Sequence, residues 1–394
     1  MREKLAIEGG EPLRTDPFPS WPVFDHREEE ALSEVVRSGQ WGVLTGMKVK
    51  EFEARFAEFQ AARYGICVVN GTAALEIAMR AAGIGPGDEV ITTPYTFIAT
   101  ASAALLVGAL PVFVDIDPET YLLDVTKVEE AITERTKALV PVHIGGCPAD
   151  MDAIMDIASK HGLRVIEDAC QAWGAEWKGR RVGAIGHLGA FSFQASKNIT
   201  AGEGGIIVTN DAPLADRCWS LHNVGRLKGG AWYEHEILGW NYRMTEWQGA
   251  VLLVQLERLP EQIARRSRNA AYLAGELGCI EGIRPLTIDE RVTQHAWHLF
   301  IFRYEADRFG GLSRDAFIEA LNAEGIPCSA GYRPLNRSRA ILEATNVATP
   351  ASCPVAERAC CEEAVWLPQN VLLGTRQDMD HIVEAVAKIQ RAKS

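Results

Sequence analysis

Short apolar runs alternate with stretches of helical periodicity over the first 260 residues. Nearly continuous apolar runs, as expected of strands buried on both faces of a parallel sheet, occur at residues 65–69, 89–92, 111–114, 138–142 and 164–166. Helical spacing of apolar residues lies between them, at 73–82, 96–107 and 151–161. This strand–helix–strand alternation predicts an α/β domain whose mostly parallel central sheet is flanked by helices.

The two ends of the chain differ from this pattern. Residues 1–25 are rich in glycine and proline and predict an extended arm, followed by helices at 28–37 and 49–64. A long helix over 246–259 is expected to be broken by Pro260. A strand at 299–304 and helices at 314–324 and 378–391 are predicted beyond it. We therefore expect a large domain over 1–260, including the arm, and a smaller C-terminal α/β domain over 261–394.

Composition and charge exclude several classes of protein. The chain carries 40 basic and 52 acidic residues, a formal charge of −12, which disfavours nucleic acid or an anionic membrane as partner. Its nine cysteines contain no CxxC pair, so we expect reduced thiols and no metal site. No apolar run is long enough for a signal peptide or a membrane span. These features predict a soluble cytoplasmic protein.

Candidate chemistry lies in loops that follow the predicted strands. In a sheet of this kind, ligands bind beyond the carboxyl ends of the strands. Gly71 and Thr72 follow the first strand and begin a helix, so they offer free N–H groups and a hydroxyl to an anion. Taken alone the motif is weak, because an ordinary helix cap is the commoner role of these two residue types.

Asp168 and Lys197 add two groups of opposite charge. Asp168 ends a buried strand, where a carboxylate can keep a pyridine nitrogen protonated, although it can also serve as a helix cap. Lys197 lies between an apolar run and the turn formed by residues 202–205, GEGG. Partial burial there would lower its pKa and make the amine a nucleophile, whereas most lysines are solvated.

The order of these motifs resembles the DegT/DnrJ/EryC1/StrS aminotransferases, which are pyridoxal-phosphate (PLP) enzymes of fold type I that aminate keto-sugars and keto-cyclitols. The resemblance covers nearly the whole chain from about Trp21. It is carried by the stretches PYTFIATASA, PVHIGGCPADMD, VIEDACQAWGA, SFQASKNITAGEGG and NYRMTEWQGA.

The resemblance implies a role for each matching residue in binding PLP. Lys197 would form the Schiff base with the cofactor, Asp168 would pair with its pyridine nitrogen, and Gln171 would lie near its ring hydroxyl. Phe97 would stack on the ring. The phosphate would be bound by Gly71, Thr72, Ser192 and, from the neighbouring subunit of a homodimer with shared active sites, Asn241.

The implied reaction is a ping-pong transfer from L-glutamine or L-glutamate to a keto-cyclitol or keto-sugar. The sequence after residue 290 resembles scyllo-inosose aminotransferases most closely. A nucleotide-linked keto-sugar as acceptor, a 3-amino-5-hydroxybenzoate synthase and a non-catalytic PLP-binding regulator are the alternatives. Dehydratases on this scaffold replace the Schiff-base lysine by histidine, so Lys197 argues against that activity.

Two positions depart from many members of the family. Trp173 and Asn336 stand where many relatives have histidine. We expect both positions to border the acceptor pocket, so they bear on which acceptor is used.

Overall fold

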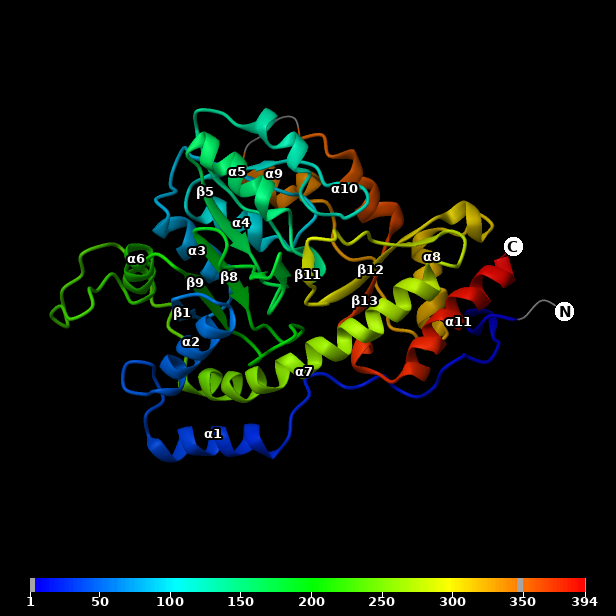
Figure 1. The fold of residues 1–394 in the computed structure, drawn as a ribbon, viewed down its shortest axis with the longest axis horizontal. Helices are drawn as coiled ribbons and strands as arrows, with labels where there is room; N and C mark the ends of the chain where they lie inside the picture. The colour runs from blue at the N-terminus through cyan, green and yellow to red at the C-terminus, as the bar shows by residue number, and fades with distance from the viewer. Residues whose placement is uncertain (1–3, 346–349, 394) are drawn as a thin grey trace.

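The computed structural model describes residues 4–345 and 350–393. A seven-stranded sheet forms the centre, in the order β1-β9-β8-β5-β4-β2-β3 (Figure 1). Its strands run parallel except for β9, which is antiparallel to both of its neighbours. They are β1 Tyr64–Val68, β2 Glu89–Thr92, β3 Leu110–Phe113, β4 Thr136–Leu139, β5 Arg164–Asp168, β8 Leu188–Ser192 and β9 Gly205–Thr209. The predicted α/β fold with a mostly parallel sheet is confirmed.

Side chains of the central strands alternate between two apolar cores. In β1, Ile66 and Val68 pack on the face covered by α3, α4 and α6, whereas Cys67 packs on the face covered by α2, α5 and α7. Burial on both faces explains why these strands are continuous apolar runs. The helices are α2 Lys48–Phe59, α3 Gly71–Ala81, α4 Ala99–Leu106, α5 Met151–His161, α6 Ala212–His222 and α7 Glu246–Leu277.

A second, antiparallel sheet in the order β10-β12-β13 lies in the C-terminal part, covered by α8 and α11 (Figure 1). A third small sheet has the order β11-β6-β7. The strands are β6 Glu176–Trp177, β7 Arg180–Arg181, β10 Ile283–Pro285, β11 Val292–Gln294, β12 Leu299–Tyr304 and β13 Ala364–Pro368. The remaining helices are α1 His26–Ser38, α8 Arg314–Ala323, α9 Arg339–Thr345, α10 Pro354–Arg358 and α11 Arg376–Lys393.

Helix α7 connects the two parts of the molecule (Figure 1). The prediction that Pro260 breaks it is wrong, because the helix runs without interruption to Leu277. Leu259 and Ile263 are buried on either side of the proline, so tertiary packing outweighs the hydrogen bond that proline cannot donate. The domain boundary expected at 260/261 falls inside α7, and the division into two domains stays a prediction. No helix within the described ranges is both long and apolar enough to cross a membrane.

The N-terminal arm packs on the C-terminal part of the chain. Leu5 is completely buried in the apolar core of that part. The backbone N–H groups of Ala6 and Leu13 each donate to the carboxylate of Glu324 at 2.9 Å. Lys388 donates to the same carboxylate at 2.8 Å, so the arm is held by apolar contacts and by hydrogen bonds to a buried, ion-paired carboxylate.

Candidate active site

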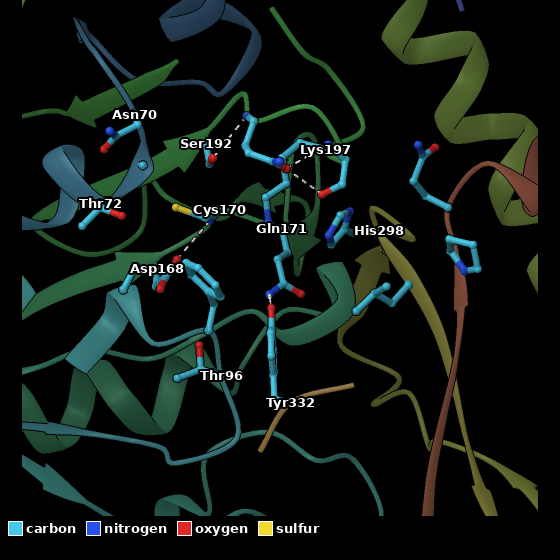
Figure 2. A pocket seen from close by; sticks show the side chains of 18 of the residues that line it. Asn70, Thr72, Thr96, Asp168, Cys170, Gln171, Ser192, Lys197, His298 and Tyr332 are labelled. Carbon is cyan, nitrogen blue, oxygen red and sulfur yellow. Dashed lines mark hydrogen bonds between the residues drawn. The ribbon is translucent and has the colours of Figure 1, made fainter. Parts of the chain in front are cut away.

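A cavity of about 800 Å³ lies beyond the carboxyl ends of β1, β5 and β8 (Figure 2). It contains seven of the eight residues to which the sequence assigns cofactor contacts: Gly71, Thr72, Phe97, Asp168, Gln171, Ser192 and Lys197. The opposite wall is contributed by distant segments, namely Trp21 of the arm, His298, Leu299, Tyr332 and residues 368–370. The cavity therefore forms where the large sheet meets the C-terminal part.

The first turn of α3 forms one end of the cavity. The Asn70 side chain caps the helix by accepting from the N–H of Ala73 at 2.8 Å. The N–H groups of Gly71 and Thr72 have no partner inside the helix, and the Thr72 hydroxyl bonds to no residue that the structure describes. A Cβ at Gly71 would lie only 2.7 Å from Cβ of Ser192, so this approach requires glycine. Free amides beside two hydroxyls at a helix N-terminus fit a phosphate dianion.

Asp168 ends β5 and presents a fixed carboxylate to the cavity. It is only 6% exposed, yet it lines the cavity wall. Its Oδ2 accepts from the Thr100 hydroxyl at 2.7 Å, and its Oδ1 accepts from the N–H of Cys170 at 3.2 Å. A buried carboxylate held in this way fits a protonated ring nitrogen as its counter-ion.

Lys197 lies in the loop between β8 and β9, on the other side of the cavity from Tyr332 (Figure 2). Its backbone N–H donates to the carbonyl of Gln194 at 2.9 Å, and Nζ lies 6.0 Å from the ring centre of Trp173. Burial lowers the pKa of the Lys197 amine below its ordinary value, although Cys170 and Asp168 oppose this shift. A larger neutral fraction makes the amine a better nucleophile and base.

Gln171 joins the large sheet to a residue that sequence reasoning missed. Its Oε1 accepts from the N–H of Gly145 at 2.7 Å, and its Nε2 donates to the hydroxyl of Tyr332 at 3.0 Å. Burial raises the pKa of Tyr332, and the nearby charge of Asp168 adds to the effect, so the phenol stays protonated. The only sequence signal for Tyr332 is that it follows a glycine. The structure explains this glycine, because Gly331 adopts a positive φ of 75° and packs against Trp366.

His298 is a second residue of the cavity that sequence reasoning did not select. Its Nδ1 lies 3.1 Å from Oδ1 of Asn198, and its ring meets that of Trp173 edge-on at 5.6 Å. Burial lowers the pKa of His298 well below its ordinary value, and the charges of Lys197 and Arg266 lower it further. The imidazole is therefore neutral in the ligand-free protein at neutral pH.

Trp173 and Asn336 are not among the described residues that line this cavity, and their expected position beside the acceptor pocket stays a prediction. Trp173 is completely buried beneath Lys197. Asn336 is 1% exposed and donates to the carbonyl of Ala351 and the carboxylate of Glu357 at 2.8 and 2.7 Å. Both side chains are held in the protein interior by packing or hydrogen bonds.

Phe97 and Asn241 occupy different surroundings. Phe97 is 54% exposed at the cavity wall, with its ring 6.3 Å from that of Tyr332, so one face is free to stack on a planar ligand. Asn241 is exposed, pairs through its backbone with Asn223 and lies outside the cavity of its own chain. Its predicted contact with a cofactor in the neighbouring subunit stays a prediction.

Comparison with known proteins gives a consistent result over the whole chain. The sequence model of the DegT/DnrJ/EryC1/StrS aminotransferase family matches residues 22–387. A protein of Streptoalloteichus tenebrarius is 41% identical in an alignment of 411 positions, which covers 99% of each chain. The activity ascribed to that protein is L-glutamine:3-amino-2,3-dideoxy-scyllo-inosose aminotransferase. The L-glutamine:2-deoxy-scyllo-inosose aminotransferase of the same organism is 40% identical, covering 99% of this chain and 98% of that protein.

A solved structure extends the similarity to the fold. The crystal structure of 3-amino-5-hydroxybenzoic acid synthase superposes with a TM-score of 0.89 at 36% sequence identity, covering 96% of this chain and 99% of that chain. Family match, identity and fold agree with the cavity geometry, which provides an amine, a carboxylate and a helix N-terminus that fits a phosphate. The chain belongs to the DegT/DnrJ/EryC1/StrS aminotransferase family and is a PLP-dependent aminotransferase.

Proposed function

We propose that this enzyme transfers the amino group of L-glutamine to the ketone of a keto-cyclitol of the scyllo-inosose type. The observation that carries the proposal is 40% identity over 99% of the chain to an L-glutamine:2-deoxy-scyllo-inosose aminotransferase. The alternative activity of a 3-amino-5-hydroxybenzoate synthase is favoured by the TM-score of 0.89 to that enzyme. A cytoplasmic location is part of the proposal and is supported by nine free cysteines.

The cavity residues divide the binding of PLP between them. Gly71, Thr72 and Ser192 would bind the phosphate, because they meet at the N-terminus of α3. Phe97 would cover one face of the ring. Gln171, whose orientation is fixed by Gly145 and Tyr332, would lie beside the ring hydroxyl.

Asp168 and Lys197 would carry the chemistry. Bound PLP supplies a carbonyl group that takes up the amino group and a pyridinium ring that withdraws electrons. Asp168 would hold the proton on the ring nitrogen, since its carboxylate is fixed by Thr100 and by the N–H of Cys170. Lys197 would bind the cofactor covalently at rest, and its freed amine would remove the proton from the α-carbon of the donor. In the second half-reaction the same amine would deliver a proton to the former carbonyl carbon of the acceptor.

The acceptor can be identified from the second half-reaction alone. The protein is loaded with pyridoxamine phosphate and mixed with scyllo-inosose, 2-deoxy-scyllo-inosose or nucleotide-linked keto-sugars, and absorbance and product mass are recorded. We expect the absorbance of lysine-bound PLP to return with the cyclitols. Its return only with a nucleotide-linked keto-sugar would overturn the proposed acceptor. If L-glutamine leaves bound PLP unchanged and another amino acid converts it, L-glutamine is not the donor.

A homodimer with shared sites is also part of the proposal. The segment between α6 and α7 extends away from the rest of the chain (Figure 1) and exposes large apolar side chains, with Tyr233 85% and Leu238 83% exposed. Burial of such side chains by a partner subunit would remove apolar surface from water. Asn241 lies near the C-terminal end of this segment and is therefore well placed to reach a neighbouring site.

Complementation between two inactive variants tests the shared site. Lys197→Ala and Asn241→Asp chains are refolded together, so that each mixed dimer has one site with both lesions and one with neither. Random pairing should restore about a quarter of wild-type activity. If Asn241→Asp alone is inactive, subunits exchange and no activity returns, Asn241 serves the site of its own chain.

A further inference from the structure

Arg266, in the middle of α7, is a buried cation with no acidic partner among the described residues. The buried basic side chains of the described residues are Arg14, Arg266, Arg314 and Lys388. Three of these pair with a carboxylate, of Asp378, Asp315 and Glu324 respectively. Arg266 is completely buried and forms no ion pair within the described part of the chain. Buried charges are normally paired, so Arg266 is the exception among these four side chains.

The guanidinium of Arg266 lies directly behind the cavity wall. Its Nε donates to Oε1 of Gln369 at 3.0 Å, and its Nη2 also donates to that oxygen. Its centre lies 5.4 Å from the ring of Trp21, and both Trp21 and Gln369 line the cavity. Nη1 is buried and has no hydrogen-bond partner in the described part of the chain. Burial lowers the pKa of Arg266 to about 9, so the group is still a cation at neutral pH.

This contact fixes the orientation of the Gln369 amide. Since Oε1 accepts two bonds from Arg266, the amide cannot be flipped without placing N–H groups against N–H groups. The Nε2 group of Gln369 donates to no residue that the structure describes, although the side chain borders the cavity. The wall therefore presents an N–H donor that is polarised by a cation behind it.

The other described residues of the cavity offer no positive charge for a carboxylate that enters with the donor. Among the described lining residues, the charged side chains apart from the reactive Lys197 are Asp168 and Glu203, both acidic. The end formed by Gly71, Thr72 and Ser192 fits the cofactor phosphate. Every α-amino acid donor brings a carboxylate, which needs a donor group or a positive charge in this low-dielectric space.

We infer that Gln369 binds the α-carboxylate of the amino-acid donor through its Nε2–H group and that Arg266 is the positioning residue that orients this amide and supplies the positive charge. The inference deepens the proposed function and rests on it, since it assumes an amino-acid donor. It assigns the donor's carboxylate to the wall formed by α7, the segment after β13 and Trp21.

Removal of the Gln369 amide tests this assignment. Gln369→Met keeps the length of the side chain and removes the donor, and Gln369→Glu pairs Arg266 internally and repels an entering carboxylate. The matched control is Gln294→Met, which removes an amide that hydrogen-bonds Ser267 of α7 but does not line the cavity. Arg266→Lys keeps the charge and Arg266→Gln removes it.

Two measurements separate carboxylate binding from general damage. The donor half-reaction is followed by the loss of the absorbance of bound PLP, with L-glutamine and with 4-aminobutanamide, which lacks the carboxylate. Calorimetry with glutaramate, which has the carboxylate but no α-amine, gives binding without turnover. We expect Gln369→Met to raise the half-saturating L-glutamine concentration about 10- to 100-fold, as for a lost hydrogen bond to a charged group, and to weaken glutaramate similarly.

The same variant should leave 4-aminobutanamide unaffected, and Gln294→Met should resemble the wild type with all three compounds. Gln369→Glu should weaken the binding of glutaramate further, and Arg266→Lys should retain more affinity for glutaramate than Arg266→Gln.

Equal effects of Gln369→Met on L-glutamine and 4-aminobutanamide, or no effect on either compound, would overturn the assignment. An effect only on the keto-cyclitol half-reaction would show that Gln369 binds the acceptor instead. If either Arg266 variant fails to fold, the two Gln369 variants still decide. A wild-type enzyme that uses a different amino acid refutes L-glutamine as donor, and the carboxylate test is then run with that amino acid.

Discussion

Gly71→Ala perturbs the phosphate end of the cavity by one methyl group. Gly71 is the first residue of α3, and its backbone does not have a positive φ, so alanine is allowed there conformationally. The added Cβ would lie 2.7 Å from Cβ of Ser192 and 3.1 Å from Sγ of Cys170. Contacts this short are not tolerated, so α3 and the end of β8 must move apart.

The cost of this displacement should fall mainly on PLP binding. Without ligand, the helix end can shift away from Ser192 and relieve the contact. With a phosphate bound, Gly71 and Ser192 must both contact the same phosphate oxygens and cannot move apart, so the overpacking costs about 1–3 kcal/mol. That energy corresponds to a roughly 5- to 150-fold weaker affinity for PLP, since 1.4 kcal/mol is tenfold. The stability of the ligand-free protein should change less, because alanine also lowers the conformational entropy of the unfolded chain.

The affinity is measured by titrating ligand-free protein with PLP and recording the absorbance of the lysine-bound cofactor, together with the melting temperature. Gly85→Ala is the matched control, because a Cβ there meets no atom within 4 Å and the backbone φ is not positive. It should bind PLP as the wild type does. Wild-type affinity in Gly71→Ala would refute the assignment of the α3 end to the phosphate.

Three further predictions concern titratable groups of the chain. Lys197→Ala should keep the fold, judged by its melting temperature, while stopped-flow absorbance shows a donor half-reaction slower by several orders of magnitude, because the base is removed. Asp168→Asn should fold and bind PLP but lose most activity, and nitrogen-15 NMR of labelled cofactor should show a protonated ring nitrogen in the wild type only. Burial lowers the pKa of His222 to about 4, of His295 to about 3 and of His298 well below its ordinary value. As the pH falls through about 6.5, the unfolded chain therefore binds protons that the folded chain does not, so each histidine lowers the free energy of unfolding with a slope that approaches about 1.4 kcal/mol per pH unit. The free energy of unfolding, measured with urea between pH 7 and 5, should depend less steeply on pH in His295→Asn than in the wild type, by the contribution of one histidine. An unchanged pH dependence would contradict the buried neutral state of His295.

The parts of the site that sequence reasoning located all follow central strands. Burial on both faces makes those strands continuous apolar runs, and parallel strands end at one edge of the sheet. Gly71, Asp168 and Ser192 could therefore be placed together before their distances were known. Their order along the chain, with Lys197 after them, supplied the family resemblance that the comparisons confirm.

The opposite wall could not be predicted in the same way. Tyr332 and His298 come from segments more than 100 residues beyond Asp168 in the chain, and only the packing of two sheets brings them to Gln171 and Lys197. Arg266 gives no signal in sequence, since a helical arginine is normally solvated and its burial depends on α7 continuing past Pro260. Helix continuation at a proline is decided by tertiary packing, which local sequence does not contain.

Charge balance in the cavity bears on the choice between the two expected donors. Two carboxylates, of Asp168 and Glu203, and one amine, of Lys197, line the described cavity, and Asp168 is already matched if it faces the pyridinium ring. The unpaired guanidinium of Arg266 can compensate one further negative charge. L-Glutamine brings one carboxylate and a neutral amide, whereas L-glutamate brings two carboxylates. The second carboxylate of L-glutamate would have no remaining cation in this wall and would meet a cavity that is otherwise acidic, which costs free energy in a low-dielectric space. The arrangement therefore favours L-glutamine as the donor for the same reason that it assigns the α-carboxylate to Gln369.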